Sequence, residues 1–344
     1  MEKEKINSLL ITWLLIVTGL IFIIIVIGGI TRLTGSGLSM VDWRPLMGSI
    51  PPITKEQWLT TFNLYKSYPQ YNIINPTMTL LEFKFIFFWE YLHRMIARLI
   101  GLALLIPYII FSIQKKIPKW LNKRVIIMIL LVLIQGIIGW YMVKSGLVNR
   151  PEVSHYRLAT HLVTALILLQ YIIWTILDLK KQQTNNKHPL AKLILIWSIG
   201  IIIQIIYGAF TAGKKAGWGY NTYPKMGETW LPEAAHMYPS LLANILENPI
   251  MIQFIHRHLG VILGIFLIII WIKIIKTKTN NTNFKIIATV VLTLLILQIL
   301  LGIFTLIYKI PILLAILHQL TGSFLLSSIT IFNYLAFNYN KANN

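Results

Sequence analysis

Residues 251–272 read MIQFIHRHLGVILGIFLIIIWI, an apolar run that contains two histidines and an arginine near its start. A bilayer core about 30 Å thick is crossed by roughly 20 apolar residues in a helix. The run therefore predicts a transmembrane helix. An ionisable side chain inside such a helix is costly, and it usually faces the interior of a helix bundle and has a specific task.

Similar apolar runs recur along the whole chain. They lie near residues 11–30, 84–111, 125–143, 156–177, 190–211, 251–272, 286–307 and 312–335. Of the 344 residues, 56% are hydrophobic and 12% are charged, and the mean hydropathy of +0.69 excludes an ordinary soluble domain. The sequence lacks the ten-residue alternating pattern of a membrane β-barrel. We predict an all-α integral membrane protein with eight transmembrane helices.

The net charge of +20 does not indicate nucleic-acid binding, because the basic residues are not gathered on one segment. They fall in every second connection between the apolar runs, as at Lys115, Lys180 and Lys273. By the positive-inside rule these connections are cytoplasmic. We therefore expect both termini in the cytoplasm and the long loops 35–82 and 212–250 on the outer side.

Four motifs occur twice, in the same order, in the two halves of the chain. The pairs are Gly28-Gly-Ile-Thr31 with Gly208-Ala-Phe-Thr211, His93-Arg94 with His256-Arg257, Gln135-x-x-x-Gly139 with Gln298-x-x-x-Gly302, and His161-x-x-Thr164 with His318-x-x-Thr321. Because four helices separate the copies, both halves enter the membrane with the same orientation, as parallel repeats. We predict two four-helix bundles, formed by residues 1–180 and 181–344.

The repeated histidines, His93 with His161 and His256 with His318, come from the second and fourth helices of each half. Two imidazoles facing each other in a four-helix bundle can occupy both axial positions of a haem iron. A lone intramembrane histidine is more often an interhelical hydrogen-bonding group, but duplication of the pair favours haem. Without cysteine, redox chemistry needs such a cofactor. The other histidines, His155, His188, His236 and His258, are assigned no ligand role.

Glu90 breaks the symmetry of the two halves. It stands one turn before His93 on the same helical face, where the second half has Gln253. One explanation is a structural ion pair with Arg94, and the other is an acid or base beside the group that His93 holds. The asymmetry suggests chemistry in one half and electron storage in the other. Arg94 and Arg257 are candidate partners for haem propionates, although snorkelling to the interface also explains them.

Longer motifs surround these residues. They are Gly28-Gly-Ile-Thr-Arg-Leu-Thr-Gly-Ser-Gly-Leu-Ser, Glu90-Tyr-Leu-His-Arg-Met, Gly139-Trp-Tyr-Met-Val-Lys-Ser-Gly-Leu, Asn221-Thr-Tyr-Pro-Lys-Met-Gly-Glu, Glu247-Asn-Pro and His318-Gln. In these motifs the chain resembles the heme A synthase family, in its cysteine-free branch from proteobacteria and mitochondria, over nearly its whole length. Other branches carry a cysteine pair in the first outer loop, so a mechanism that relies on that pair does not transfer.

The resemblance implies an oxidoreductase that oxidises the C8 methyl group of heme O to a formyl group, giving heme A for cytochrome oxidase assembly. It implies that His93 and His161 hold the substrate haem, with Glu90 as the catalytic residue. It also implies that His256 and His318 hold a permanent haem b. A heme O synthase would deliver the substrate, and the protein would lie in a bacterial inner membrane. The residues leave self-association and the electron-transfer partner open.

Two other functions stay open from the residues alone. One is a bis-haem quinol oxidoreductase, which would place its haems at two depths, whereas all four repeated histidines lie toward the outer side. The other is a non-catalytic haem carrier. Chromatography of extracted haem separates them, because heme A or a hydroxylated intermediate favours the synthase and haem b alone favours the others.

Overall fold

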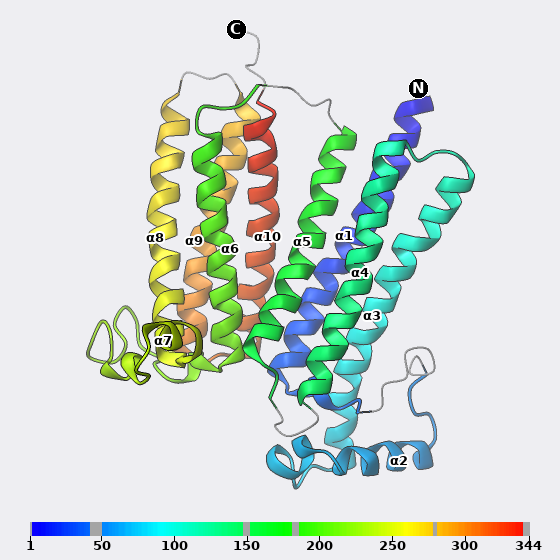
Figure 1. Ribbon diagram of the computed structural model, residues 1–344, viewed down its shortest axis with the longest axis vertical. Coiled ribbons are helices and arrows are strands. Elements are labelled where there is room, and N and C mark those ends of the chain that lie inside the picture. The colour runs from blue at the N-terminus through cyan, green and yellow to red at the C-terminus, as the bar shows by residue number, and fades with distance from the viewer. Residues whose placement is uncertain (1, 42–49, 147–151, 181–185, 278–280, 340–344) are drawn as a thin grey trace. The chain divides into compact units, whose positions relative to one another are not determined.

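A computed structural model describes residues 2–41, 50–146, 152–180, 186–277 and 281–339. Within these ranges, eight helices are long and apolar enough to cross a membrane, which confirms the predicted all-α membrane fold (Figure 1). They are α1 (Glu2–Leu33), α3 (Leu80–Ile113), α4 (Lys119–Gly146), α5 (His155–Lys180), α6 (Ala191–Gly213), α8 (Pro249–Lys276), α9 (Thr282–Ile307) and α10 (Ile312–Phe337).

Several of these helices begin before the apolar runs because polar residues cap them. Thr79 and Glu82 form a capping box, in which each side chain bonds the backbone of the other, so α3 begins at Leu80. Asn248 caps α8 and is followed by Pro249, a residue well suited to the first turn of a helix. Hydropathy finds the membrane-crossing part of a helix, whereas these caps set where it starts.

The connections 35–82 and 212–250, which are predicted to lie on the outer side and are called the outer loops below, contain helical segments that hydropathy does not predict. They include two short α-helices, α2 (Lys55–Lys66) and α7 (Leu241–Glu247). They also include the 3-10 helices η1 (Ser36–Leu38), η4 (Ala216–Trp218) and η5 (Glu233–His236), and the π-helical turn η3 (Gln70–Ile74). None of these segments has an apolar run long enough to cross a bilayer, so a search for membrane spans passes over them.

Helix α2 runs crosswise to α3 at its outer end (Figure 1). Its residues Phe62 and Tyr65 are buried against Phe83 of α3, and the Phe62 and Phe83 rings stack with centroids 5.0 Å apart. After α2, the side chain of Gln70 donates a hydrogen bond to the carbonyl of Gly35, 2.7 Å away. The aromatic cluster and this hydrogen bond fix the first outer loop over the ends of α1 and α3.

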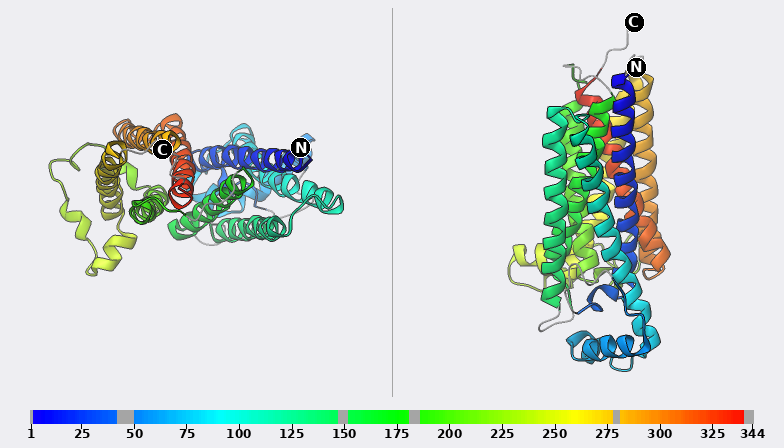
Figure 2. Two further views of the ribbon diagram at one scale, coloured as in Figure 1. Left: turned by 90° about the horizontal axis from the view of Figure 1, so that it is seen from above. Right: turned by 90° about the vertical axis from the view of Figure 1, so that its right-hand side faces the viewer.

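The chain divides into two compact units, one of residues 16–164 and the other of residues 1–15 with 165–344. In the second unit, α6 packs against α8, α8 against α9, α9 against α10 and α10 against α6, so these four helices form a closed ring (Figure 2). In the first unit, α3 packs against α4, and Thr31 of α1 donates a hydrogen bond to the carbonyl of Trp89 in α3. The domain boundary after residue 180 and the parallel-repeat relation stay predictions.

Two contacts within the second unit bear on the topology. The side chain of Asn7, near the start of α1, donates to the carbonyl of Leu179, near the end of α5. The backbone N–H of His188, before α6, donates to the carbonyl of Ala336 at the end of α10. These are the helix ends that eight consecutive crossings bring to one side of a membrane. The assignment of that side to the cytoplasm stays a prediction.

Candidate haem site

Each of the four histidines predicted to bind haem iron lies against a glycine of a neighbouring helix. The pairs are His93 with Gly28, His161 with Gly139, His256 with Gly208, and His318 with Gly302. A Cβ atom on these glycines would lie 3.3, 3.4, 3.0 and 2.9 Å, respectively, from the nearest imidazole atom. The glycines of the repeated motifs therefore make room for the rings. These glycines recur in the repeated motifs, but the motifs alone do not indicate this task.

The two histidines of the C-terminal half face each other. The ring centroids of His256 and His318 are 6.4 Å apart, and the ring planes make an angle of 88°. Two imidazoles on opposite sides of one metal ion, each with a nitrogen about 2 Å from it, have ring centres roughly 6 Å apart. The pair thus has the spacing for both axial ligands of a haem iron. Among the described residues there is no cluster of three or more metal-ligating side chains, but a haem needs only two from the protein.

Hydrogen bonds hold these two rings. The Nδ1 atom of His318 lies 3.1 Å from the carbonyl oxygen of Gln298, to which it can donate, so Nε2 is the nitrogen that would bind a metal. The amide nitrogen of Gln298 lies 3.3 Å from that Nε2 atom. Gly302 follows Gln298 by one helical turn, and its missing side chain lets the ring approach that carbonyl. The amide nitrogen of Gln204 lies 3.1 Å from Nδ1 of His256 and donates to the backbone carbonyl of the same histidine at 2.8 Å.

The histidines of the N-terminal half are held less firmly. The amide of Gln135 donates to the backbone carbonyl of His161 at 3.0 Å, and Nδ1 of that ring is buried without a hydrogen-bond partner. The ring of His93 lies against Gly28, where an added Cβ would be 3.3 Å from its Nε2 atom. The same motif therefore surrounds a fixed ring in one half and a ring with an unused donor or acceptor in the other.

The carboxylate of Glu90 is 3% exposed and has a partner for each oxygen. Its Oε2 atom accepts hydrogen bonds from the backbone N–H and hydroxyl of Ser39, both 2.7 Å, and from the backbone N–H of Met40, 2.8 Å. Its Oε1 atom lies 2.5 Å from Nη2 of Arg94. The ion pair that the sequence offered as a structural explanation is therefore present, together with three bonds that the sequence gave no means to expect.

Gln253 takes the corresponding place in the other half. It is 2% exposed, and its amide nitrogen donates to the carbonyl of Tyr220 at 3.1 Å. Tyr220 follows the turn η4, as Ser39 and Met40 follow η1. In both halves the side chain one turn before the first histidine thus makes hydrogen bonds to the backbone at the start of the outer loop. This side chain is the charged carboxylate of Glu90 in one half and the neutral amide of Gln253 in the other.

The two arginines next to the histidines also reach the outer loops. Arg94 donates from Nη2 to the carbonyl of Met40 at 3.1 Å. Arg257 donates from Nη2 to the carbonyls of Thr222 and Lys225, while its Nε and Nη1 atoms are buried without a hydrogen-bond partner. Buried guanidinium nitrogens of this kind call for an acceptor, and a carboxylate such as a haem propionate would supply one.

The remaining histidines have other surroundings. His188 is buried beside Phe284, and its Nδ1 accepts a hydrogen bond from the backbone N–H of Leu190. Burial lowers the pKa of His188 below its usual value. Nδ1 of His258 lies 2.8 Å from the carbonyl oxygen of Phe254 in its own helix. The ring of His155 lies 3.9 Å from that of the adjacent Tyr156, and His236 belongs to η5.

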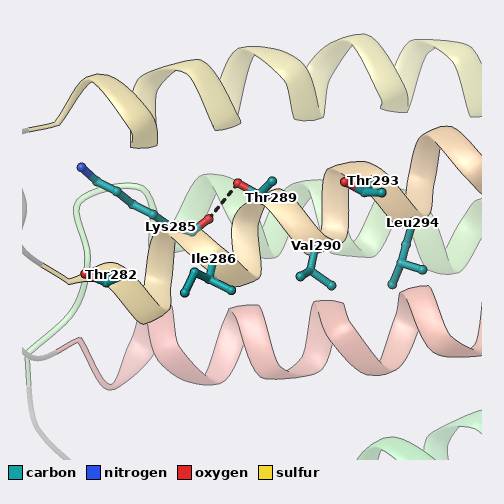
Figure 3. Close-up of a pocket in the computed structure, with 7 residues that line it drawn as sticks. All are labelled: Thr282, Lys285, Ile286, Thr289, Val290, Thr293 and Leu294. Carbon is teal, nitrogen blue, oxygen red and sulfur yellow. Dashed lines mark hydrogen bonds between the residues drawn. The ribbon is translucent and has the colours of Figure 1, made fainter.

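A hollow of about 450 Å³ lies along α9. Its lining residues come from this one helix, so it is a groove in the helix surface and holds none of the histidines (Figure 3). The hydroxyl of Thr289 in this groove donates to the carbonyl of Lys285 at 3.0 Å, an ordinary bond within a helix.

Comparison with known proteins identifies the family of the chain. The family described as "Cytochrome oxidase assembly protein" matches residues 11–330, which include all four histidines and both glutamines of the C-terminal site. The chain belongs to this family.

Individual relatives of the chain carry one name. It is 39% identical to the heme A synthase of Flavobacterium johnsoniae, over 96% of this chain and 98% of that protein. It is 42% identical to the heme A synthase of Rickettsia felis, over 94% and 96% of the two chains. It is also 41% identical to "Heme A synthase COX15" of Bos taurus, over 93% of this chain and 79% of that protein.

Proposed function

We propose that this chain is a heme A synthase, an oxidoreductase that converts heme O to heme A by oxidising the C8 methyl group to a formyl group. Its similarity to proteins of that name over most of their length supports the activity. The observation that carries the proposal is the pair His256 and His318, with ring centroids 6.4 Å apart and a glycine behind each ring.

The C-terminal pair is proposed to hold a resident haem b, which would supply one-electron transfer when bound. In favour of a permanent group, Nδ1 of each ring has a glutamine partner, which is the Gln298 backbone carbonyl for His318 and the Gln204 amide for His256. Arg257, with its Nε and Nη1 atoms unpaired, is proposed to bind a propionate of this haem. In this half the residue that corresponds to Glu90 is the neutral Gln253, as expected for a site that stores an electron and moves no substrate proton.

The N-terminal pair, His93 and His161, is proposed to bind heme O as the substrate. A substrate must enter and leave, so its ligands must be able to release it. A Cβ on Gly28 or Gly139 would lie farther from the neighbouring histidine ring than a Cβ on Gly208 or Gly302, so the rings of this half have more room. Nδ1 of His161 also has no hydrogen-bond partner. Both features fit that requirement better than the surroundings of the C-terminal pair.

Glu90 is proposed as the catalytic residue of the N-terminal site, with Arg94 placing the carboxylate and binding a substrate propionate. Conversion of a methyl to a formyl group withdraws electrons and protons from the carbon next to the macrocycle and adds an oxygen atom to it, so the reaction requires an oxygen source and an electron acceptor in addition to the residues of the site. A buried negative charge would stabilise positive charge that develops there. Of the two tasks considered for Glu90, charge stabilisation fits its surroundings better than proton uptake, because each of its oxygens already accepts from a donor.

We further propose that the protein lies in a bacterial inner membrane with both termini in the cytoplasm and that a heme O synthase delivers its substrate. The basic connections support the orientation. The two halves, residues 1–180 and 181–344, would then carry the substrate site and the haem b site, respectively. Homo-oligomers are compatible with this arrangement.

The test is expression of the full chain in cells that supply heme O, followed by purification and chromatography of the extracted haem. We expect heme A or a hydroxylated intermediate in addition to haem b. Alanine at His256 or His318 should remove haem b, and alanine at His93 or His161 should stop conversion. Haem b alone, with no oxidised product, would favour an electron-transfer protein or haem carrier. A purified protein without any haem would contradict the proposed sites.

A further inference from the structure

The residue one helical turn after each histidine differs between the halves. In the C-terminal half it is a glycine, Gly260 after His256 and Gly322 after His318. In the N-terminal half the same positions hold alanine, which are Ala97 after His93 and Ala165 after His161. The function proposed above gives no reason for this difference.

Both C-terminal glycines make room for a glutamine amide. A Cβ on Gly260 would lie 3.0 Å from Nε2 of Gln204, and a Cβ on Gly322 would lie 3.1 Å from Nε2 of Gln298. Both distances are shorter than a normal van der Waals contact between carbon and nitrogen. An alanine at either position would therefore push the amide away.

The two amides lie beside the histidine rings. Nε2 of Gln204 is 3.1 Å from Nδ1 of His256, and Nε2 of Gln298 is 3.3 Å from Nε2 of His318. The amide oxygens of both glutamines are buried and have no hydrogen-bond partner. A metal-bound imidazole carries its proton on the nitrogen that does not face the metal. Rotation of the Gln204 amide would offer its unpaired oxygen to that proton on His256, in exchange for the hydrogen bond that its nitrogen now donates to the His256 carbonyl. The Gln298 amide instead faces Nε2 of His318, whose Nδ1 already has the Gln298 backbone carbonyl as its partner.

The N-terminal half lacks this arrangement. Ile24 stands four residues before Gly28, where the other half has Gln204 four residues before Gly208. Gln135 is present, but its amide bonds the backbone carbonyl of His161 and leaves Nδ1 of the ring without a partner. An isoleucine offers no hydrogen bond to the ring of His93.

We propose that Gln204 is a positioning residue that fixes the axial imidazole of His256, and that Gly260 admits its amide. Gln204 lies on the helix beside His256 and acts through the ring, not on the iron. In the N-terminal half, Ile24 and Ala97 leave the ring of His93 free to turn when a haem enters or leaves. The glutamine together with its glycine thus distinguishes a retained haem from an exchanging one. This inference rests on the proposed haem sites and assigns new residues to them.

The test uses the purified full chain in a His161→Ala background, so that the release of haem from the C-terminal site is followed alone. Haem transfer to excess apomyoglobin gives the release rate. The EPR spectrum of the ferric haem reports the relative orientation of the two axial rings. We expect Gly260→Ala to speed release about tenfold, the lower end of the effect of losing a partner behind a metal ligand, and to change the EPR spectrum. Gly136→Ala is the matched control, because a Cβ there has nothing within 4 Å.

A double-mutant cycle shows whether the glycine acts through the amide. In a Gln204→Ala background, Gly260→Ala should have no further effect on release or on the EPR spectrum. Unchanged release in Gly260→Ala, or faster release that persists without Gln204, would overturn the proposal. The converse pair, Ile24→Gln with Ala97→Gly, should slow haem release from the N-terminal site when His161 is intact.

The proposed haem sites can fail separately from this inference. If His256→Ala and His318→Ala leave haem content unchanged, the site assignment is wrong. If they abolish haem binding while Gly260→Ala behaves like Gly136→Ala, the site assignment stands and the positioning role of Gln204 is wrong.

Discussion

Oε2 of Glu90 accepts two hydrogen bonds from Ser39, one from the backbone N–H and one from the hydroxyl, each 2.7 Å long. These bonds join the helix that carries His93 to the start of the first outer loop. The same carboxylate pairs with Arg94. Glu90 therefore has a structural task as well as the catalytic one proposed for it, and the two can be separated by experiment.

Glu90→Gln removes the charge but keeps an amide that can still meet the loop, as Gln253 does in the other half. We expect haem binding to persist and conversion of heme O to stop, because the negative charge beside the substrate is lost. Chromatography of extracted haem measures both quantities. Glu82→Gln, which changes an exposed capping carboxylate at the start of the same helix, is the control and should convert heme O normally. Normal turnover in Glu90→Gln would remove its catalytic role.

Ser39→Ala separates the loop contact from the charge, since it removes one of the bonds to Glu90 and leaves the ion pair. A lost hydrogen bond to a charged group costs about 1.5–3 kcal/mol. We expect a lower unfolding temperature with the haem content retained. Thermal unfolding in detergent, followed by circular dichroism, measures this. A variant as stable as the wild type would mean that Ser39 contributes no net stability through Glu90.

Alanine in place of the glycine behind a histidine ring should affect haem binding differently in the two halves. Gly302→Ala places a Cβ 2.9 Å from Cε1 of His318, so the ring must move, whereas Gly139→Ala meets Cε1 of His161 at 3.4 Å, an ordinary contact. We expect Gly302→Ala to lower haem b affinity about 10- to 100-fold and Gly139→Ala to retain its haem. The pyridine haemochrome spectrum of the purified variants measures haem content. Equal haem content in both variants would contradict the closer contact between Gly302 and the ring of His318.

Asn248 stabilises the second outer loop and the start of α8. It is fully buried, its amide donates to the carbonyl of Ala234 at 2.8 Å, and its oxygen caps Ile250 at 2.9 Å. We expect Asn248→Ala to lower the free energy of unfolding by about 1–3 kcal/mol, the cost of unsatisfied buried partners. Asn72→Ala removes one exposed hydrogen bond and serves as the control. Denaturant unfolding in detergent would compare them, and equal stabilities would rule out the proposed task of Asn248.

His188 should make stability depend on pH. Burial lowers its pKa in the folded chain, whereas an unfolded histidine has a pKa of about 6.5. The unfolded chain therefore binds the proton more readily, and the stability from neutral His188 is present above about pH 6.5 and is lost as the pH falls toward the folded pKa. We expect the unfolding temperature to fall more steeply between about pH 7 and pH 5 in the wild type than in His188→Gln. Parallel pH curves for the two proteins would contradict this.

The sequence alone determined the membrane crossings and the order of the repeated motifs. Hydropathy is a local property, and the thickness of the bilayer sets the length of each span, so no knowledge of packing was needed. The pairing of His256 with His318 could also be predicted, because both recur at matching places in the repeat. The short helix α2 was missed because its stability comes from aromatic packing against Phe83 and not from a long apolar run.

Only the tertiary structure decided what surrounds each candidate residue. Glu90 was open to two explanations in the sequence, and its contact with Ser39 depends on how the loop after α1 folds back onto α3. The contact between His318 and Gly302 depends on which faces of α9 and α10 meet. A sequence motif records spacing along one helix, whereas hydrogen bonds and close contacts between helices depend on their rotation and depth. Packing of all the helices sets these together.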